Sequence, residues 1–115
     1  MRRGEVRLID LEPVRGSEAN KRRPAVVVSN DQANAAAEKL GRGVVTVVPL
    51  TSSVHRVYAF QTLLPAATSG LRIDSKAQAE QVRAVAVERV GPVVARLPEE
   101  LMLAVDDALR VHLQL

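Results

Sequence analysis

Short runs of apolar and β-branched residues alternate with polar turns along most of the chain, which is the pattern of a mainly β protein. The runs that predict strands are residues 5–10, 25–29, 44–50, 58–64 and 93–97, with a further short extended segment at residues 71–75. Pro24 lacks a backbone donor and therefore suits the first position of the second strand. Residues 11–23 form a polar connection that is longer than most, and such loops are often functional. Residues 65–70 contain Pro and Gly and predict a turn.

One helix is predicted in the first half of the chain, over the Ala-rich residues 32–40. Either Asn30 or Asp31 can cap its start, because both side chains accept hydrogen bonds from the first backbone amides. Gly41 can end it, because glycine adopts the left-handed conformation that commonly follows a helix.

A second helix is predicted to begin after Pro98, with Glu99 and Glu100 in its first turn, where the helix dipole favours anions. Asp106 and Arg110 are spaced to pair on its outer face. Its apolar stripe consists of Leu101, Val105, Ala108, Leu109 and His112. The short strands and this closing helix together predict a small, partly open barrel.

The secondary structure of residues 76–90 is ambiguous from the sequence. Residues 77–85 have good helix propensity, and in an extended conformation neither face of the segment is cleanly apolar, so the period alone favours neither helix nor strand.

The composition is that of a single small globular domain over residues 1–115, with 47% hydrophobic and 25% charged residues. Tyr58 and Phe60 are the only aromatic residues, so the core must be built from Val, Leu and Ala. The absence of cysteine excludes a disulfide framework and a thiolate zinc site. No apolar run approaches the roughly 18 residues of a membrane span, and the start lacks the pattern of a signal peptide, so we expect a cytoplasmic protein with no membrane partner.

The net charge of +3 is unevenly distributed along the chain. Residues 1–30 hold seven cations and four anions, whereas residues 91–115 hold two cations and four anions. A basic front end indicates an acidic or polyanionic partner.

Several catalytic motifs are absent from the sequence: a Gly-rich phosphate loop, a His-Glu metal-binding spacing and a Gly-x-Ser-x-Gly nucleophile elbow. There are only two histidines. His112 lies on the apolar stripe of the last helix, where a packed or fraying-end histidine is favoured over a catalytic one. His55 lies in a polar loop, where a solvated histidine is favoured over one that contacts a substrate.

The remaining chemical signal is a set of basic and hydroxyl residues: Lys21, Arg22, Arg23, Thr51, Ser52, His55, Arg56 and Arg83. Arg23 precedes the second strand and Thr51 follows the third, so the two would meet at one edge if these strands are antiparallel neighbours. A guanidinium binds two phosphate oxygens at once, and a hydroxyl can donate to another. Spacing alone favours the plainer alternative of a solvated strand end.

Several motifs occur in order along almost the whole chain: Gly4-Glu5-Val6, Gly16-Ser17-Glu18, Arg23-Pro24, Pro49-Leu50-Thr51-Ser52, Gly70-Leu71 and residues 79–85. In this combination the chain resembles the MazF/PemK/Kid family of toxin endoribonucleases. The resemblance implies a small SH3-like barrel of the CcdB/PemK type, paired into a homodimer, and it favours a strand over residues 76–85.

The resemblance also implies an activity and partners. We expect sequence-specific cleavage of single-stranded RNA, usually messenger RNA and possibly ribosomal or transfer RNA, without a metal or other cofactor. A cognate antitoxin would silence the toxin through an acidic tail, and DNA would be contacted only indirectly, through that antitoxin.

By the same resemblance, the essential arginine and threonine of the family correspond to Arg23 and Thr51. Glu18, Gln81 and Arg83 correspond to residues that are better candidates for substrate contact than for chemistry. Four more candidates for RNA binding come from the basic and hydroxyl set: Lys21, Arg22, Ser52 and His55.

RNA would supply its own nucleophile, the 2′-hydroxyl, so the protein must stabilise charge at phosphorus and move two protons. Arg23 can supply charge-assisted hydrogen bonds and is a candidate acid, and Thr51 can supply a neutral hydrogen bond. Arginine is a poor base because it stays protonated, so the base is open between Glu18, His55 and water.

One departure from the family lies in the first strand, where many relatives have an aromatic residue and this chain has Arg7-Leu8. Base stacking on rings should therefore be limited, with recognition by groove shape, hydrogen bonds and stacking on arginine. Two alternatives to a nuclease are a non-catalytic, gyrase-poisoning toxin of the same fold and a barrel that binds RNA without cutting it.

Overall fold

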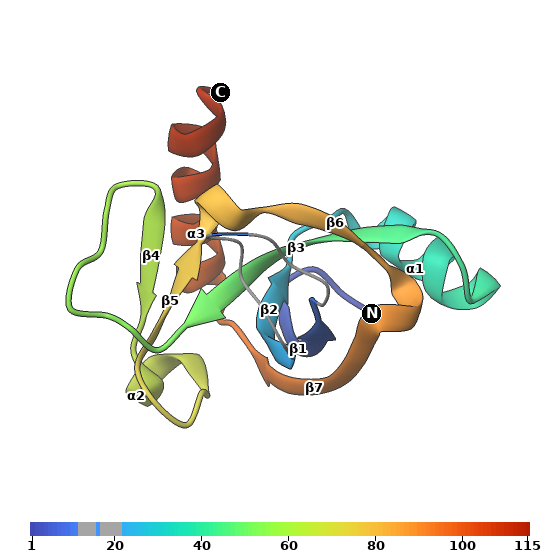
Figure 1. The fold of residues 1–115 in the computed structure, drawn as a ribbon, viewed down its shortest axis with the longest axis horizontal. Helices are drawn as coiled ribbons and strands as arrows, with labels where there is room; N and C mark the ends of the chain where they lie inside the picture. Colours follow the sequence, from blue (N-terminus) through green and yellow to red (C-terminus); the bar gives the residue numbers. More distant parts are fainter. Residues whose placement is uncertain (12–15, 17–21) are drawn as a thin grey trace.

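The computed structural model describes residues 1–11, 16 and 22–115, and the predicted site residues Glu18 and Lys21 lie outside these residues. The described strands are β1 (Glu5–Asp10), β2 (Arg22–Val27), β3 (Val44–Thr51), β4 (Gln61–Leu64), β5 (Ser75–Gln78), β6 (Arg83–Ala86) and β7 (Val90–Arg96). The helices are α1 (Asp31–Leu40), α2 (Ala66–Ser69) and α3 (Glu99–Leu113), with the 3₁₀ turns η1 (Ala79–Gln81) and η2 (Val87–Arg89). The predicted mainly β fold with short helices and a closing C-terminal helix is confirmed (Figure 1).

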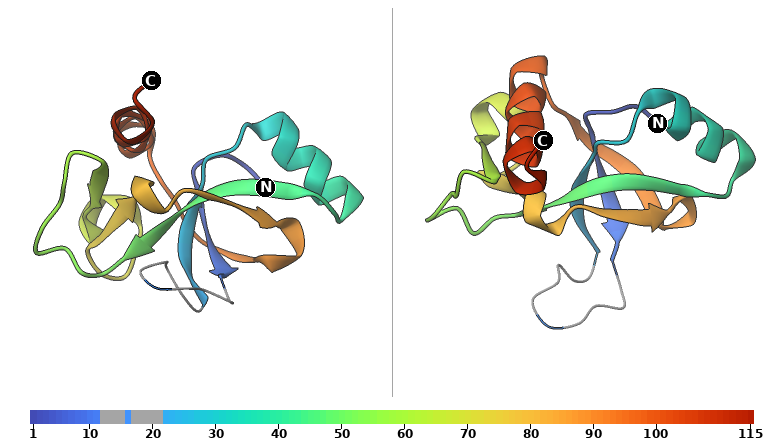
Figure 2. Two further views of the ribbon diagram at one scale, coloured as in Figure 1. Left: turned by 45° about the horizontal axis from the view of Figure 1, so that its top comes forward. Right: turned by 90° about the horizontal axis from the view of Figure 1, so that it is seen from above.

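The described strands form one seven-stranded sheet in the order β4-β5-β3-β2-β1-β7, with β6 also paired to β3. All of these pairings are antiparallel. The long strand β3 is the central strand of the sheet, because β2 pairs with one of its edges and both β5 and β6 pair with the other. The sheet coils strongly, with α3 beside β4 and α1 beside the start of β3 (Figure 2).

Alternate residues of the central strands enter two separate hydrophobic cores, as the two-residue period of a strand requires. The first core combines strand residues with the start of α3, and its main members are Val6, Val26, Val48, Leu50, Leu64, Met102 and Val105. The second core lies on the other side of the same strands, and its members are Ile9, Leu11, Ala25, Val27, Ala37, Val45, Val47 and Val85. These two sides fix the directions in which the site residues point.

Strand boundaries differ from the predictions where pairing continues past an apolar run. β2 begins at Arg22 and not at residue 25, because Pro24 lies opposite Leu8 and Arg22 opposite Asp10 in the ladder with β1. β7 likewise begins earlier, at Val90.

Two other segments are interrupted by turns. The strand predicted over residues 58–64 begins only at Gln61, because the Gln61 amide donates to the Tyr58 carbonyl in a turn. The predicted turn at residues 65–70 contains the short helix α2. Residues 76–85 are mainly extended, as the resemblance favoured, but η1 interrupts them, and η2 separates β6 from β7.

The caps of α1 agree with the sequence. The Asn30 side chain accepts from the Ala33 amide at 2.8 Å, so Asn30 is the N-cap rather than Asp31. Gly41 ends the helix with a φ of 66°, which is costly for other residues.

Two expectations for α3 are wrong. His112 is exposed and Met102 is buried, so the buried stripe lies nearer the start of the helix. Arg110 pairs with Asp107 at 2.9 Å, because Asp106 is taken by Arg3. No helix within the described ranges is long and apolar enough to cross a membrane.

Candidate active site

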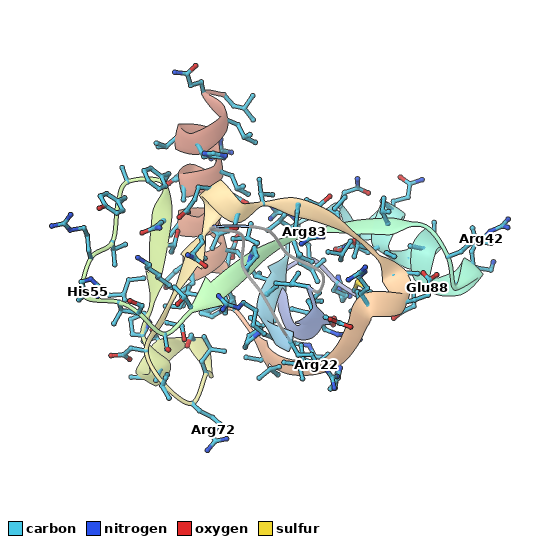
Figure 3. The ribbon with its side chains drawn as sticks, viewed as in Figure 1. Arg22, Arg42, His55, Arg72, Arg83 and Glu88 are labelled. Atoms are coloured by element: carbon cyan, nitrogen blue, oxygen red, sulfur yellow. The ribbon has the colours of Figure 1, made fainter. Side chains whose placement is uncertain are left out.

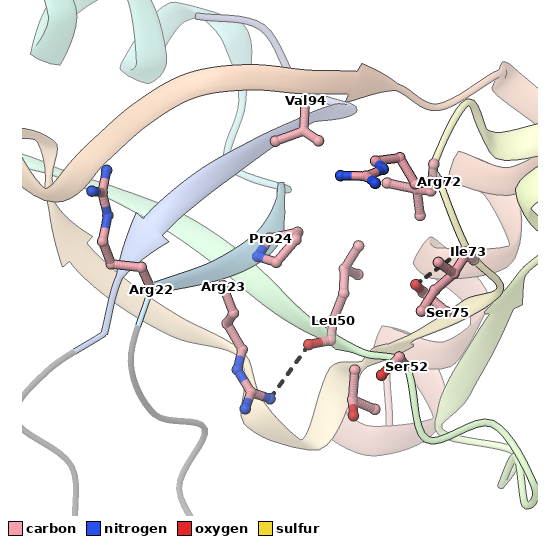
Figure 4. Close-up of a pocket in the computed structure, with 11 residues that line it drawn as sticks. Arg22, Arg23, Pro24, Leu50, Ser52, Arg72, Ile73, Ser75 and Val94 are labelled. Atoms are coloured by element: carbon pink, nitrogen blue, oxygen red, sulfur yellow. Dashed lines mark hydrogen bonds between the residues drawn. The ribbon is translucent and has the colours of Figure 1, made fainter.

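The antiparallel pairing of β2 with β3 brings Arg23 and Thr51 to one edge of the sheet. Ala25 lies opposite Pro49, so the same register, continued by two residues, places Arg23 opposite Thr51. The Arg23 guanidinium also donates to the Leu50 carbonyl at 3.4 Å, at the long end of the hydrogen-bond range (Figure 4). Two strand ends that are far apart in the sequence therefore lie close together in space.

Both residues border a cavity of about 390 Å³. Its apolar floor comes from Pro24, Leu50, Leu71, Ile73 and Val94, and its polar rim comes from Arg22, Arg23, Thr51, Ser52, Arg72 and Ser75. A volume of this size lies within the range of small-ligand sites, and an apolar floor with a polar rim is their usual lining.

The rim is strongly cationic. Among the described residues, three arginines and no carboxylate line the cavity. Neither the Arg22 guanidinium nor the Arg72 guanidinium forms a hydrogen bond or ion pair with any residue that the structure describes. Guanidinium groups without a protein partner are available to bind an anion such as a phosphate.

The polar pair and the apolar floor lie on opposite sides of the strand ends. Arg23 lies opposite Ile9 of the second core, whereas Pro24 lies opposite Leu8. Figure 4 accordingly shows Arg72 and Val94 on one side of Leu50 and Arg23 on the other. A phosphate at Arg23 and Thr51 would thus lie at the rim, with an apolar hollow beside it.

Thr51 is held with its hydroxyl in a defined direction. Its Oγ1 accepts a hydrogen bond from the Ser53 amide at 3.3 Å. Accepting this bond leaves the hydroxyl proton free to be donated to a bound oxygen.

His55 lies in the loop that follows Thr51 and does not line the cavity. It is exposed, and its Nδ1 is 3.3 Å from the Ser53 hydroxyl. Figure 3 shows it well apart from Arg22. The structure thus supports a solvated loop histidine more than a role as the general base.

Gln81 and Arg83 are not among the cavity-lining residues either. Gln81 belongs to η1, and Arg83 lies opposite Val47 of β3. Since Val47 and Thr51 are four residues apart on one strand, they face the same side, and Arg83 shares that side with them. Arg83 is half-buried, and its guanidinium has no hydrogen bond or ion pair to the described residues, so it extends the cationic surface beyond Thr51.

The sequence missed the wall formed by Arg72, Ile73 and Ser75. This segment leaves α2 through Gly70, whose φ of 82° turns the chain, and Leu71 then anchors it in the first core. The one signal in the sequence was a basic residue directly after the Gly-Leu pair, and no periodicity linked it to Arg23.

Within the described residues, no group of three or more histidines and carboxylates could hold a metal ion. The fold and this site define a small β-barrel with a cationic, hydroxyl-bearing cavity at one edge of its sheet.

Comparison with known proteins gives the family. The sequence model for the PemK-like, MazF-like toxin of type II toxin-antitoxin systems matches residues 2–113. The chain therefore belongs to this toxin family.

Individual relatives agree with this assignment. The chain is 57% identical over its whole length to Endoribonuclease MazF9 of Mycobacterium tuberculosis (strain ATCC 25618 / H37Rv), of which it covers 98%. It is 30% identical over 116 aligned positions to Endoribonuclease EndoA of Bacillus subtilis (strain 168), covering 96% of that protein.

Solved structures show the same fold. The crystal structure of MazF from Deinococcus radiodurans matches the whole chain with a TM-score of 0.79 at 24% identity, and 97% of that chain is covered. An endoribonuclease from a mycobacterial species in complex with its cognate antitoxin matches with a TM-score of 0.77 at 19% identity, over 100% of this chain and 96% of the other.

Proposed function

We propose that this protein is a sequence-specific endoribonuclease that cuts single-stranded RNA and acts as the toxin of a toxin–antitoxin pair. The observation that carries the proposal is the meeting of Arg23 and Thr51 at a cavity whose described lining contains three arginines and no carboxylate. The names of two relatives, which are endoribonucleases at 57% and 30% identity over the whole chain, support it.

In the proposed reaction the RNA 2′-oxygen forms a bond to the adjacent phosphorus while the bond from phosphorus to the 5′-oxygen breaks. The 2′-hydroxyl loses a proton, the 5′-oxygen gains one, and negative charge builds on the two remaining phosphoryl oxygens. Arg23 can bind both of these oxygens, and its fixed position at the strand end means that it need not reorganise as the charge develops.

Thr51 contributes a neutral hydrogen bond to the same group. The Ser53 amide orients its oxygen, and its proton points to a bound acceptor. Arg23 is also the candidate acid for the 5′-oxygen. For the base, Glu18 and water are better candidates than His55, which lies outside the cavity lining.

The other predicted residues are proposed to hold the RNA strand. Lys21, Arg22 and Arg83 would neutralise backbone phosphates, and Ser52 and Gln81 would donate hydrogen bonds. Arg72 joins this group, because it lines the cavity and its guanidinium has no partner among the residues that the structure describes.

The test is 5′-end sequencing of a long RNA after incubation with the protein and with Arg23→Ala, Thr51→Ala and Thr51→Ser. We expect Arg23→Ala to lose about 100- to 1,000-fold in rate, since one charge-stabilising donor typically contributes that much. Thr51→Ser should retain more activity than Thr51→Ala, because it keeps the hydroxyl.

Arg42→Ala is the matched control, because Arg42 is an exposed arginine at the distant α1–β3 turn (Figure 3). It should cut like the wild type. Wild-type cleavage by Arg23→Ala would contradict the assignment, and binding of RNA without new 5′ ends from the wild type would favour a barrel that only binds. An all-deoxy strand should bind and resist cutting, since it lacks the nucleophile.

We further propose that the protein acts in the cytoplasm as a homodimer, and that an antitoxin with an acidic tail silences it by covering the arginines of the cavity. A gyrase supercoiling assay separates this toxin from a gyrase poison of the same fold, and we expect no effect on supercoiling.

A further inference from the structure

Both aromatic side chains of the chain lie in the loop of residues 52–60, between β3 and β4. The rings of Tyr58 and Phe60 are stacked, with centroids 5.3 Å apart and planes 4° from parallel. The Arg56 guanidinium carbon lies 5.7 Å from the centre of the Tyr58 ring, and its Nη1 donates to the Tyr58 hydroxyl at 3.0 Å. Tyr58 is 45% exposed, so this group of three side chains is a surface feature rather than part of a core.

Hydrogen bonds fix the loop to the barrel along its length. At its start, the Ser53 amide donates to Thr51 Oγ1 at 3.3 Å. At its end, the Tyr58 amide donates to Gln61 Oε1 at 3.2 Å. The Gln61 side chain is held in turn, because its Nε2 donates to Glu80 at 2.7 Å.

The middle of the loop is held by Lys76. Its ammonium is the donor in a 2.6 Å hydrogen bond to the Arg56 carbonyl, and the residue is only 8% exposed. Because Lys76 lies directly opposite Thr51 in the β3–β5 ladder, the same pair of strand ends positions the threonine and the loop. A surface held in this way loses little conformational entropy when it binds a ligand.

The charge of the loop matches a nucleic acid. Residues 52–60 contain Arg56 and His55 and no acidic residue. An aromatic surface beside a guanidinium is suited to an unpaired base, because every base has a flat face and its phosphate is an anion.

We propose that Tyr58, supported by Phe60 and Arg56, is a stacking platform for an unpaired base of the RNA strand that is cut. This rests on the proposed function, since the loop leaves the site directly at Thr51. The platform adds affinity and fixes the position of the strand relative to the scissile phosphate. It thereby contributes to the choice of the cut sequence.

The chain offers a direct probe, because Tyr58 is its single tyrosine. Protein containing 3-fluorotyrosine has one ¹⁹F resonance, from position 58. We expect a deoxyadenosine 12-mer to shift this resonance and an abasic 12-mer with the same phosphates to leave it in place. Neither strand can be cleaved, so the measurement does not depend on catalysis. Equal shifts with both strands, or none with either, would overturn the proposal.

The second measurement uses variants. Tyr58→Ala should weaken binding of the deoxyadenosine 12-mer by about 5- to 150-fold, the range of base stacking on a side chain, and Tyr58→Trp should restore it. The dependence of binding on salt should not change, because the ring carries no charge. Leu103→Ala, at an apolar side chain of α3 that is 55% exposed, is the control and should bind like the wild type.

The cleavage assay separates this proposal from the proposed function. If the wild type cuts RNA and Tyr58→Ala cuts the same sequences at the same rate, the proposed stacking platform is wrong, whereas the proposed nuclease function is supported. If the wild type cuts no RNA while the base-dependent ¹⁹F shift is seen, the proposed nuclease function is wrong, whereas the proposed stacking platform is supported. If Tyr58→Ala loses only neutralisation by the antitoxin, the loop binds protein and the proposal fails.

Discussion

Buried charge on β1 shows how single residues shape the surroundings of the site. Glu5 is 5% exposed, and its Oε1 accepts from Arg7 at 2.8 Å. Arg7 also donates to the Gly91 carbonyl at 2.8 Å, which ties β1 to β7. Arg7 is thus a paired arginine with a structural role.

The pKa of Glu5 makes stability depend on pH. Burial by itself raises the pKa of this carboxyl, but the hydrogen bond and charge of Arg7, with a backbone hydrogen bond, outweigh burial and hold the pKa below its ordinary value. A lowered pKa in the folded state stabilises the fold above the unfolded pKa of about 4.3, and this stabilisation is lost as the pH falls through the folded pKa.

We therefore expect Glu5→Gln to be less stable than the wild type at pH 7, with the difference shrinking below about pH 4. Urea unfolding at several pH values measures this. Glu99→Gln, at an exposed carboxyl of α3, is the control, and a difference for Glu5→Gln that is constant from pH 7 to pH 3 would contradict the assignment.

At the scale of elements, the β1–β7 pairing is irregular and depends on a glycine. The register shifts between Val6 and Arg7 and again between Arg7 and Ile9. A Cβ atom at Gly91 would lie 2.7 Å from the Leu8 carbonyl oxygen and 3.6 Å from the Arg22 guanidinium. The close approach of the two backbones leaves no room for a side chain there.

Gly91→Ala should therefore lower the free energy of unfolding by about 1–3 kcal/mol, as is typical of overpacking. Val93→Thr, at a half-exposed residue of the same strand, should change stability by less than about 0.5 kcal/mol. Equal stability of Gly91→Ala and the wild type in urea unfolding would refute the close contact.

The elements that the sequence predicted best are those with a strong local cause. The Asn30 cap, the Gly41 stop and the β-branched run of β3 each act over a few residues, and all three are found. The meeting of Arg23 and Thr51 was predicted on the condition that their two strands are antiparallel neighbours, and β2 and β3 are.

The features that the sequence did not predict depend on packing between segments that are distant in the sequence. The wall around Arg72 depends on where α2 returns the chain, and the stacking of Tyr58 on Phe60 depends on a turn within a predicted strand. This turn places both rings together in the loop that follows Thr51, where the proposed platform would supply ring stacking that the first strand lacks.

For the molecule as a whole, the net positive charge is small, but several arginines lie together at the cavity. The net charge is only +3, yet three arginines line the cavity and Arg83 lies on the adjoining surface. Binding of RNA should thus release counterions, and its affinity should fall steeply with salt.

Arg22→Ala should reduce the slope of log affinity against log salt by roughly 0.7, the value for one phosphate of a single strand, while Arg42→Ala leaves it unchanged. Fluorescence anisotropy with a labelled all-deoxy strand at several salt concentrations measures both. Equal slopes for the two variants would show that Arg22 does not contact a phosphate.

The central position of β3 should protect its backbone amide hydrogens from exchange with solvent. Its pairings to β2, β5 and β6 all join segments distant in sequence, so its amides can open only when most of the sheet opens. In hydrogen–deuterium exchange, Val45, Val47 and Val48 should be among the last amides to be labelled, at the rate of global unfolding. Thr51 is the last residue of this strand, so the candidate reaction centre is attached to the part of the molecule that unfolds last.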